Sequence, residues 1–133
     1  MSVNVILTPN FEKEAKKLIK KYRSLKQELL ELSTELEENP RTGTQIKENV
    51  YKIRLAVKSK GKGKSGGMRL ITYVETELVE KEDETDVYLL SIYDKSNQAN
   101  ISNKLIEQIV QEIQEELEQL EKDNLESKTG EEE

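Results

Sequence analysis

The spacing of the apolar residues changes at Asn39-Pro40 from a helical period to a strand-like alternation. Before this point, two amphipathic stretches predict helices over about 11–22 and 24–38, and a short joint connects them into a hairpin. The proline stops the second helix. A short β-rich run at 3–8 precedes the first. The N-terminal part of the chain is therefore expected to be a strand followed by a helical hairpin.

Three β-rich runs follow the predicted hairpin. They lie at 50–57, 68–74 and 87–93, with a Gly/Lys/Ser loop after the first and an acidic turn at 75–86 after the second. A last amphipathic helix follows Ser102, which is suited to cap it. The order β-α-α-β-β-β-α is typical of an α+β fold, in which an N-terminal helical hairpin packs on a small antiparallel β-sheet.

The length and the C-terminal sequence predict the domain organisation. A chain of 133 residues favours one domain, which we expect to span 1–122. The acidic segment 123–133 buries too little apolar surface to order itself, so a disordered tail is expected there. No run comes near the ~20 apolar residues of a membrane span, and the N-terminus lacks a signal-peptide pattern. We therefore expect a cytoplasmic protein without membrane contacts.

The residue types that the chain lacks restrict its chemistry. It has no Cys and no His. This excludes disulfides, thiol nucleophiles and thiolate metal sites, and it removes the commonest general base. The carboxylates lie on predicted helix surfaces or in the acidic turn without a converging pattern, so no metal site and no cofactor are predicted. Acid–base chemistry has to use Lys, Arg, Tyr or carboxylates.

The positive charge of this acidic chain is concentrated between residues 41 and 70. The net charge of the whole chain is −6 at pH 7, yet this segment holds nine Lys or Arg and one acidic residue. Such a cluster predicts a site for a polyanion, with RNA or DNA phosphate as the first choice. A solvated hairpin connection, with edge lysines that oppose aggregation, is the alternative. A nucleotide-binding P-loop is not favoured, because its spacing is absent and no helix follows.

Strand alternation gathers the basic side chains on one face. Lys52 and Arg54 lie opposite their apolar neighbours, and Arg69 opens the next strand. Tyr93 and Lys95, at the end of the third β-rich run, are expected to reach the same face. The intervening glycine-rich loop is expected to be a mobile arm that adds four more lysines: Lys58, Lys60, Lys62 and Lys64.

Three motifs of this region occur together in a known protein family. They are Lys52-Ile-Arg-Leu-Ala, Lys60-Gly-Lys-Gly-Lys-Ser-Gly-Gly-Met-Arg69 and Leu89-Leu-Ser-Ile-Tyr93-Asp-Lys95. In this order and spacing they resemble the RelE/ParE toxin superfamily, and most of all its HigB-like branch. The resemblance covers about residues 11–105. It implies a RelE-like fold and the toxin half of a type II toxin–antitoxin pair.

The resemblance also implies an activity and partners. RelE-like toxins are ribosome-dependent mRNA endoribonucleases in which a 2′-hydroxyl attacks the adjacent phosphate without a metal, while cationic side chains stabilise the developing charge. The implied partners are a cognate antitoxin, the ribosome and mRNA, and the oligomeric state is left open. The residues implied as catalytic are Arg54, Arg69, Tyr93 and Lys95. Lys62 and Lys64 match loop lysines of the family that are implied to contact RNA, and Lys52 matches a neighbouring basic position. Lys58 and Lys60, on the same loop, are expected from their charge to bind RNA as well.

One departure from the family leaves the general base open. The best-known members carry an Arg and a Tyr shortly after the third β-rich run, where this chain has Asn97 and Ile101. Tyr93 or a loop lysine is expected to take the place of that tyrosine. Two other functions stay open beside the nuclease: a non-catalytic RNA- or ribosome-binding module or degenerate toxin, and a ParE-like inhibitor of DNA gyrase.

Overall fold

A computed structural model of the chain contains two compact units, Met1–Asn100 and Ile101–Glu133. The structure describes residues 2–61, 63, 66–79, 82–96 and 101–132. The loop lysines Lys62 and Lys64, which the sequence predicts to bind RNA, lie outside the described residues, and so does Asn97.

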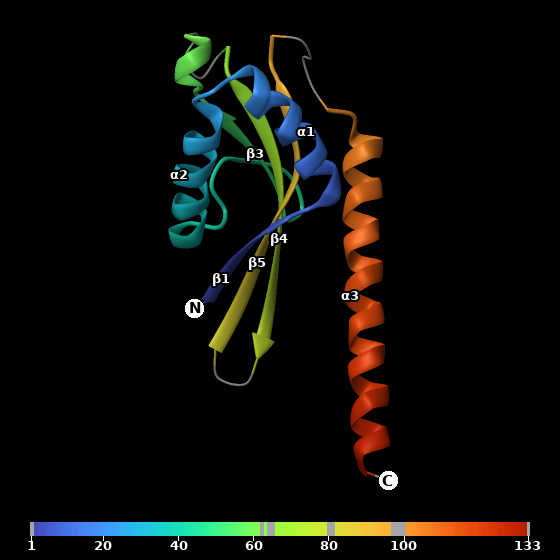
Figure 1. Cartoon of the computed structure of the whole chain (residues 1–133). Coiled ribbons are helices and arrows are strands. Elements are labelled where there is room, and N and C mark those ends of the chain that lie inside the picture. Colours follow the sequence, from blue (N-terminus) through green and yellow to red (C-terminus); the bar gives the residue numbers. More distant parts are fainter. Residues whose placement is uncertain (1, 62, 64–65, 80–81, 97–100, 133) are drawn as a thin grey trace. The chain divides into compact units, whose positions relative to one another are not determined.

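The first unit is built on a five-stranded sheet with the strand order β1-β5-β4-β3-β2 (Figure 1). Strand β1 runs parallel to β5, and the other neighbours are antiparallel. The predicted α+β class with a helical hairpin is confirmed, although the sheet is mixed at its β1 edge. The strands are β1 Ser2–Leu7, β2 Thr44–Lys47, β3 Val50–Leu55, β4 Met68–Val79 and β5 Glu82–Asp94.

Two features of the sheet differ from the sequence prediction. Strand β2 was not expected, because its four residues include only one apolar side chain, Ile46. The acidic turn expected at 75–86 is wrong for most of its length. Strands β4 and β5 continue through it in a regular ladder that pairs Glu75 with Asp86 and Thr76 with Thr85. Backbone pairing sustains these strands where the acidic side chains obscure the apolar pattern.

The helical hairpin consists of α1, Pro9–Lys21, and α2, Leu25–Glu38. Thr8 caps α1, because its Oγ1 accepts a hydrogen bond of 3.2 Å from the backbone N–H of Phe11. The same hydroxyl donates to the carbonyl of Leu89 at 2.8 Å, which ties the start of the helix to β5.

The core lies between the hairpin and one face of the sheet. Phe11, Leu25 and Leu36 of the hairpin are buried in one cluster with apolar residues of three strands. Leu70 is central to the sheet side of this cluster, with Ile53 opposite it on β3 and Ile92 opposite it on β5. Since successive strand residues alternate between faces, the neighbours of these residues in sequence lie on the other face.

The second unit consists mainly of helix α3, Asn103–Glu132. The Oγ of Ser102 accepts a hydrogen bond of 3.1 Å from the backbone N–H of Leu105, which confirms the predicted cap. The helix continues past Lys122 through the segment expected to be a disordered tail. A 3.0 Å hydrogen bond from Gln119 to Asp123, four residues apart, supports this continuation. Disorder of the tail in solution stays a prediction. No helix of the described residues is long and apolar enough to cross a membrane.

Candidate functional site

Three predicted site residues form one row across three adjacent strands. Arg54 on β3 lies directly opposite Arg69 on β4, and Arg69 lies directly opposite Tyr93 on β5. Residues opposite each other in an antiparallel pair share a face, with Cβ atoms roughly 4.5–5.5 Å apart. This face is the one turned away from the helical hairpin, because Ile53 and Leu70, which alternate with the arginines, lie in the core.

Two further cations flank this row. Lys52 and Lys95 each lie two residues from a member of the row, so alternation places them on the same face. Burial lowers the pKa of Lys52, and the positive charges of Lys95, Arg69 and Arg54 lower it further. Lys52 is therefore close enough to the other three cations to be repelled by them, and its protonated form is disfavoured.

The row runs from an exposed end to a buried end. Arg54 is exposed, Lys52 and Lys95 are half-buried, and Arg69 and Tyr93 each keep about 4% of their surface exposed. The guanidinium of Arg69 donates a 3.2 Å hydrogen bond to the carbonyl of Met68. We call this group the cation row. It consists of four cations, Lys52, Arg54, Arg69 and Lys95, together with Tyr93.

The loop that follows β3 begins as a fixed turn. Residues Lys58–Lys60 form a short 3-10 helix, where the sequence predicted a mobile arm. The buried carboxylate of Glu28 on α2 accepts a 2.8 Å hydrogen bond from the backbone N–H of Lys58 and another of 2.8 Å from the hydroxyl of Ser24. Ser24 in turn accepts a 2.9 Å hydrogen bond from the backbone N–H of Ser59. The beginning of α2 thus holds the turn in place.

Lys60 lies in an ion pair within the fold. Its Nζ is 2.9 Å from Oδ1 of Asp94, and the two side chains keep only 6% and 4% of their surface exposed. The same ammonium donates hydrogen bonds to the carbonyl of Gly66 at 2.7 Å and to the hydroxyl of Ser96 at 2.6 Å. Lys60 and Lys58 therefore differ in their surroundings, because Lys58 is exposed to solvent and Lys60 is paired within the fold. The sequence had predicted RNA contact for both.

The sequence and the fold both have counterparts among known proteins. The family model described as the RelE toxin of the RelE/RelB toxin–antitoxin system matches residues 3–133. The chain belongs to the RelE toxin family. The predicted superfamily is confirmed, and the HigB-like branch stays a prediction. The family pairs each toxin with an antitoxin, so a protein antitoxin is the partner that membership implies.

A solved structure of a mutant of the E. coli toxin RelE in the free state is similar to this RelE-family toxin. The two sequences are 20% identical, and the match has a TM-score of 0.51 and covers 85% of this chain and 99% of the other. At this identity the likeness shows the fold alone. No curated protein matches the chain.

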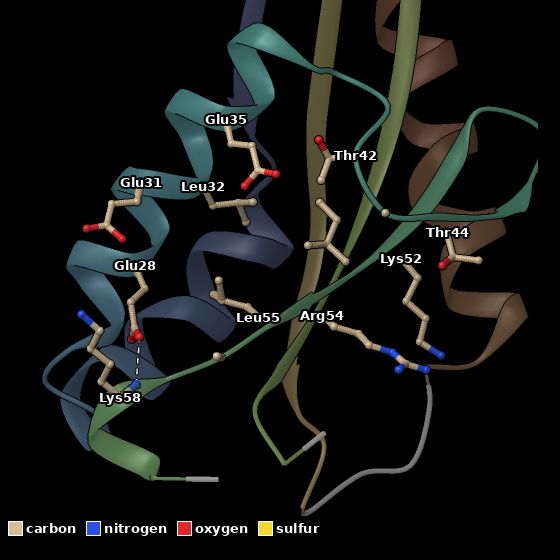
Figure 2. A pocket seen from close by; sticks show the side chains of 13 residues that line it. Glu28, Glu31, Leu32, Glu35, Thr42, Thr44, Lys52, Arg54, Leu55 and Lys58 are labelled. Atoms are coloured by element: carbon tan, nitrogen blue, oxygen red, sulfur yellow. Dashed lines mark hydrogen bonds between the residues drawn. The ribbon is translucent and has the colours of Figure 1, made fainter. Parts of the chain in front are cut away.

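A cleft of about 540 Å³ opens beside the cation row of the toxin, between α2 and β3 (Figure 2). The charged groups that line it are three carboxylates of α2 and three cations of β3 and the turn. Figure 2 shows the charged ends of Lys52 and Arg54 close to each other. At this position the charge of Arg54 contributes to the lowered pKa of Lys52. The charged lining residues are Glu28, Glu31, Glu35, Lys52, Arg54 and Lys58.

Several residues of the toxin that organise the site were not singled out from the sequence. Glu28 has the spacing of a solvated helix residue, and Asp94 looks like one acid in a polar stretch. Their roles depend on tertiary contacts with residues 30 and 34 positions away, and no local pattern reports such contacts.

Within the part of the chain that the structure describes, no three carboxylates converge to hold a metal ion.

Proposed function

We propose that this RelE-family toxin is an mRNA endoribonuclease that acts on the ribosome, in the cytoplasm, without a metal. The observation that carries the proposal is the direct pairing of Arg54 with Arg69, with Lys52 and Lys95 beside them. Like charges placed directly opposite each other destabilise a sheet. A fold that keeps four cations on one face is suited to an anion that neutralises them, and the RNA backbone is such an anion.

The proposed reaction joins the O2′ atom to phosphorus and breaks the bond between phosphorus and O5′. The products are a cyclic phosphate and a 5′-hydroxyl. Negative charge builds up on the phosphoryl oxygens in the transition state, where Arg54 and Arg69 stabilise it. This step is balanced by two proton transfers, one away from the 2′-hydroxyl and one to the leaving oxygen.

Lys52 is the proposed acceptor of the 2′-hydroxyl proton. Its lowered pKa increases the fraction of neutral amine at physiological pH, which a general base requires. Lys95 and Tyr93, at the other side of the row, are the proposed donors to the 5′-oxygen. The best-known family members have a tyrosine where this chain has Ile101. In this assignment its role falls to groups that share one face of the sheet. Lys58, exposed on the turn, is proposed to contact RNA as the sequence predicts.

The test is cleavage of a defined mRNA by purified toxin on programmed ribosomes. Wild-type toxin is expected to leave mRNA fragments with 5′-hydroxyl ends, in buffer containing EDTA at a concentration that ribosomes tolerate. Replacing Arg69 by Ala is expected to lower the rate about 10²–10³-fold, as for the loss of one charge-stabilising group in other enzymes. Lys17→Ala, a change on the exposed side of α1, is the control for loss of a positive charge.

Other outcomes select the alternative functions. Ribosome binding with intact mRNA would indicate a non-catalytic binding module or degenerate toxin. Inhibition of gyrase in a supercoiling assay, with no mRNA cleavage, would indicate a ParE-like target. Equal cleavage by wild-type toxin and the Arg69 variant would contradict the assignment of the row.

A further inference from the structure

The ion pair between Lys60 and Asp94 connects segments that are far apart in the sequence. Besides Lys60, the carboxylate of Asp94 accepts a 2.9 Å hydrogen bond from the hydroxyl of Tyr22, at the end of α1. It also accepts one of 2.9 Å from the backbone N–H of Ser96. The ammonium of Lys60 lies 5.8 Å from the centre of the Tyr22 ring. The hairpin, the 3-10 turn and the end of β5 therefore meet at Asp94.

Asp94 faces the hairpin, whereas its neighbours in sequence face the cation row. It lies opposite Met68 in the β4–β5 pair, and Met68 belongs to the core on the hairpin side. Because side chains alternate along a strand, Tyr93 and Lys95 lie on the opposite face. Contacts of Tyr22 and Lys60 with the Asp94 side chain, on the hairpin side of the sheet, thus fix the backbone that carries the two proposed proton donors.

The same network closes onto the start of β4. Lys60 binds the carbonyl of Gly66, and the backbone N–H of Lys95 donates a 3.1 Å hydrogen bond to the carbonyl of Gly67. Gly67 approaches β3 so closely that a Cβ placed on it would lie 2.1 Å from the carbonyl oxygen of Leu55. Leu55 and Gly67 are one and two residues from Arg54 and Arg69, respectively. The network therefore ends beside both arginines of the row.

The charges of this pair depend on each other. Burial by itself would raise the pKa of Asp94, but the hydrogen bonds from Lys60, Ser96 and Tyr22 outweigh it and hold the pKa below its ordinary value. The contact with Lys60 therefore favours the ionised form of Asp94. Removing one member leaves the other as an uncompensated charge among buried groups.

We propose that Lys60 and Asp94 are positioning residues for the cleavage reaction. In this proposal Lys60 holds Tyr93 and Lys95 in place and does not itself bind RNA. This inference rests on the proposed nuclease function. It assigns Lys60 a role different from that of Lys58 on the same turn. It also assigns a role to Asp94, an anion that would repel RNA if it lay on the binding surface.

The decisive variant is Asp94→Asn, because it keeps the size of the side chain and leaves the Lys60 cation in place. Cleavage on programmed ribosomes is measured as a function of toxin-to-ribosome ratio and of salt. Positioning predicts a rate at saturation at least tenfold lower, with ribosome affinity and its salt dependence unchanged. Direct RNA contact by Lys60 predicts a saturating rate equal to that of wild type, because the freed ammonium would still bind RNA and would keep or raise the affinity for the ribosome.

Lys60→Met is the second variant of this experiment. Positioning predicts that this variant matches Asp94→Asn, with a lower saturating rate and an unchanged slope of affinity against salt. If Lys60 instead binds a phosphate, its loss would lower the affinity and reduce that slope by about one, and the proposal would be overturned. Lys17→Met is the matched control for a lysine on the protein surface. Thermal unfolding of each variant checks that a folded protein is assayed.

A readout that does not need activity separates this proposal from the proposed function. Amide chemical shifts of Tyr93 and Lys95 are expected to move in both Asp94→Asn and Lys60→Met, and to stay in place in Lys17→Met. Unmoved shifts would overturn the positioning role even if the toxin cleaves mRNA. Moved shifts in a toxin that leaves mRNA intact would support the positioning of these residues and reject the nuclease function.

Discussion

Arg54 and Arg69 lie directly opposite each other in neighbouring strands, on the face of the sheet that the helical hairpin does not cover. Opposite pairs of like charge weaken a sheet, and this pair has Lys52 and Lys95 close by. Stability and activity are therefore expected to oppose each other at this position. In the proposed reaction these cations act together.

Arg54→Gln is expected to stabilise the toxin while it impairs cleavage. Arg54 is exposed, so removing its charge relieves the repulsion of the pair, which is worth roughly 0.2–1 kcal/mol. The rate of mRNA cleavage is expected to fall about 10²-fold or more. Urea unfolding and ribosome-programmed cleavage, run on the same samples, measure both effects. A variant that is both less stable and less active would show that Arg54 is a structural residue.

Lys52 is expected to shape the pH dependence of both stability and cleavage. Its pKa in the folded protein lies below 10.5, the ordinary value, so between the two values the unfolded chain binds more protons. The contribution of Lys52 to stability therefore rises with pH across that window. Its neutral fraction rises over the same range, so single-turnover cleavage is expected to speed up with pH. Lys52→Arg is expected to abolish this rise, and a pH profile unchanged by the substitution would exclude Lys52 as the base.

Asp94 is expected to contribute to loss of stability in acid. Its pKa in the folded protein lies below 3.8, since its hydrogen bonds from Lys60, Ser96 and Tyr22 outweigh the effect of burial. The stabilisation is thus fully present above 3.8 and is lost as the pH falls through the lower folded value. Unfolding temperatures between pH 2 and 7 test this. The gap between wild type and Asp94→Asn is expected to narrow toward the acid end, and a constant gap would contradict the ionised pair.

The sequence reveals the elements with local patterns and misses those that depend on distant pairing. Helical periodicity predicts both hairpin helices, and strand alternation places Arg54 on the face opposite Ile53. The parallel pairing of β1 with β5 joins residues such as Val5 and Val87, which no local pattern relates. Lys60 illustrates the same limit at the site. Within its Gly/Lys run it looks like any other lysine, and only the folded chain brings Asp94 to it.

The acidic residue Glu28 is expected to stabilise the 3-10 turn. Its buried carboxylate accepts the backbone N–H of Lys58 and the hydroxyl of Ser24. Glu28→Ala leaves these donors without a partner, which costs about 1–3 kcal/mol. Hydrogen exchange is expected to accelerate at the amides of Lys58 and Ser59. Glu31→Ala, an exposed carboxylate on the same helix, is the control and is expected to change stability by less than about 0.5 kcal/mol.

Gly67 is expected to tolerate no side chain, because it lies against β3. A Cβ at this position would meet the carbonyl oxygen of Leu55 at 2.1 Å, so one of the two backbones has to move. Gly67→Ala is therefore expected to destabilise the toxin by roughly 1–3 kcal/mol, the range for overpacked sites. It is also expected to slow cleavage, since the shift displaces the strands that carry the two arginines.

Gly61 offers a matched control on the same loop. Its φ of +73° lies in the left-handed region, but nothing stands within 4 Å of a Cβ built there. Asn adopts this conformation more readily than other residues with side chains, so Gly61→Asn is expected to cost less stability than Gly67→Ala and to leave cleavage near wild type. Denaturant unfolding and cleavage assays compare the two variants. Equal losses from both would show that general stiffening of the loop, and not the contact between Gly67 and Leu55, determines the geometry of the cation row.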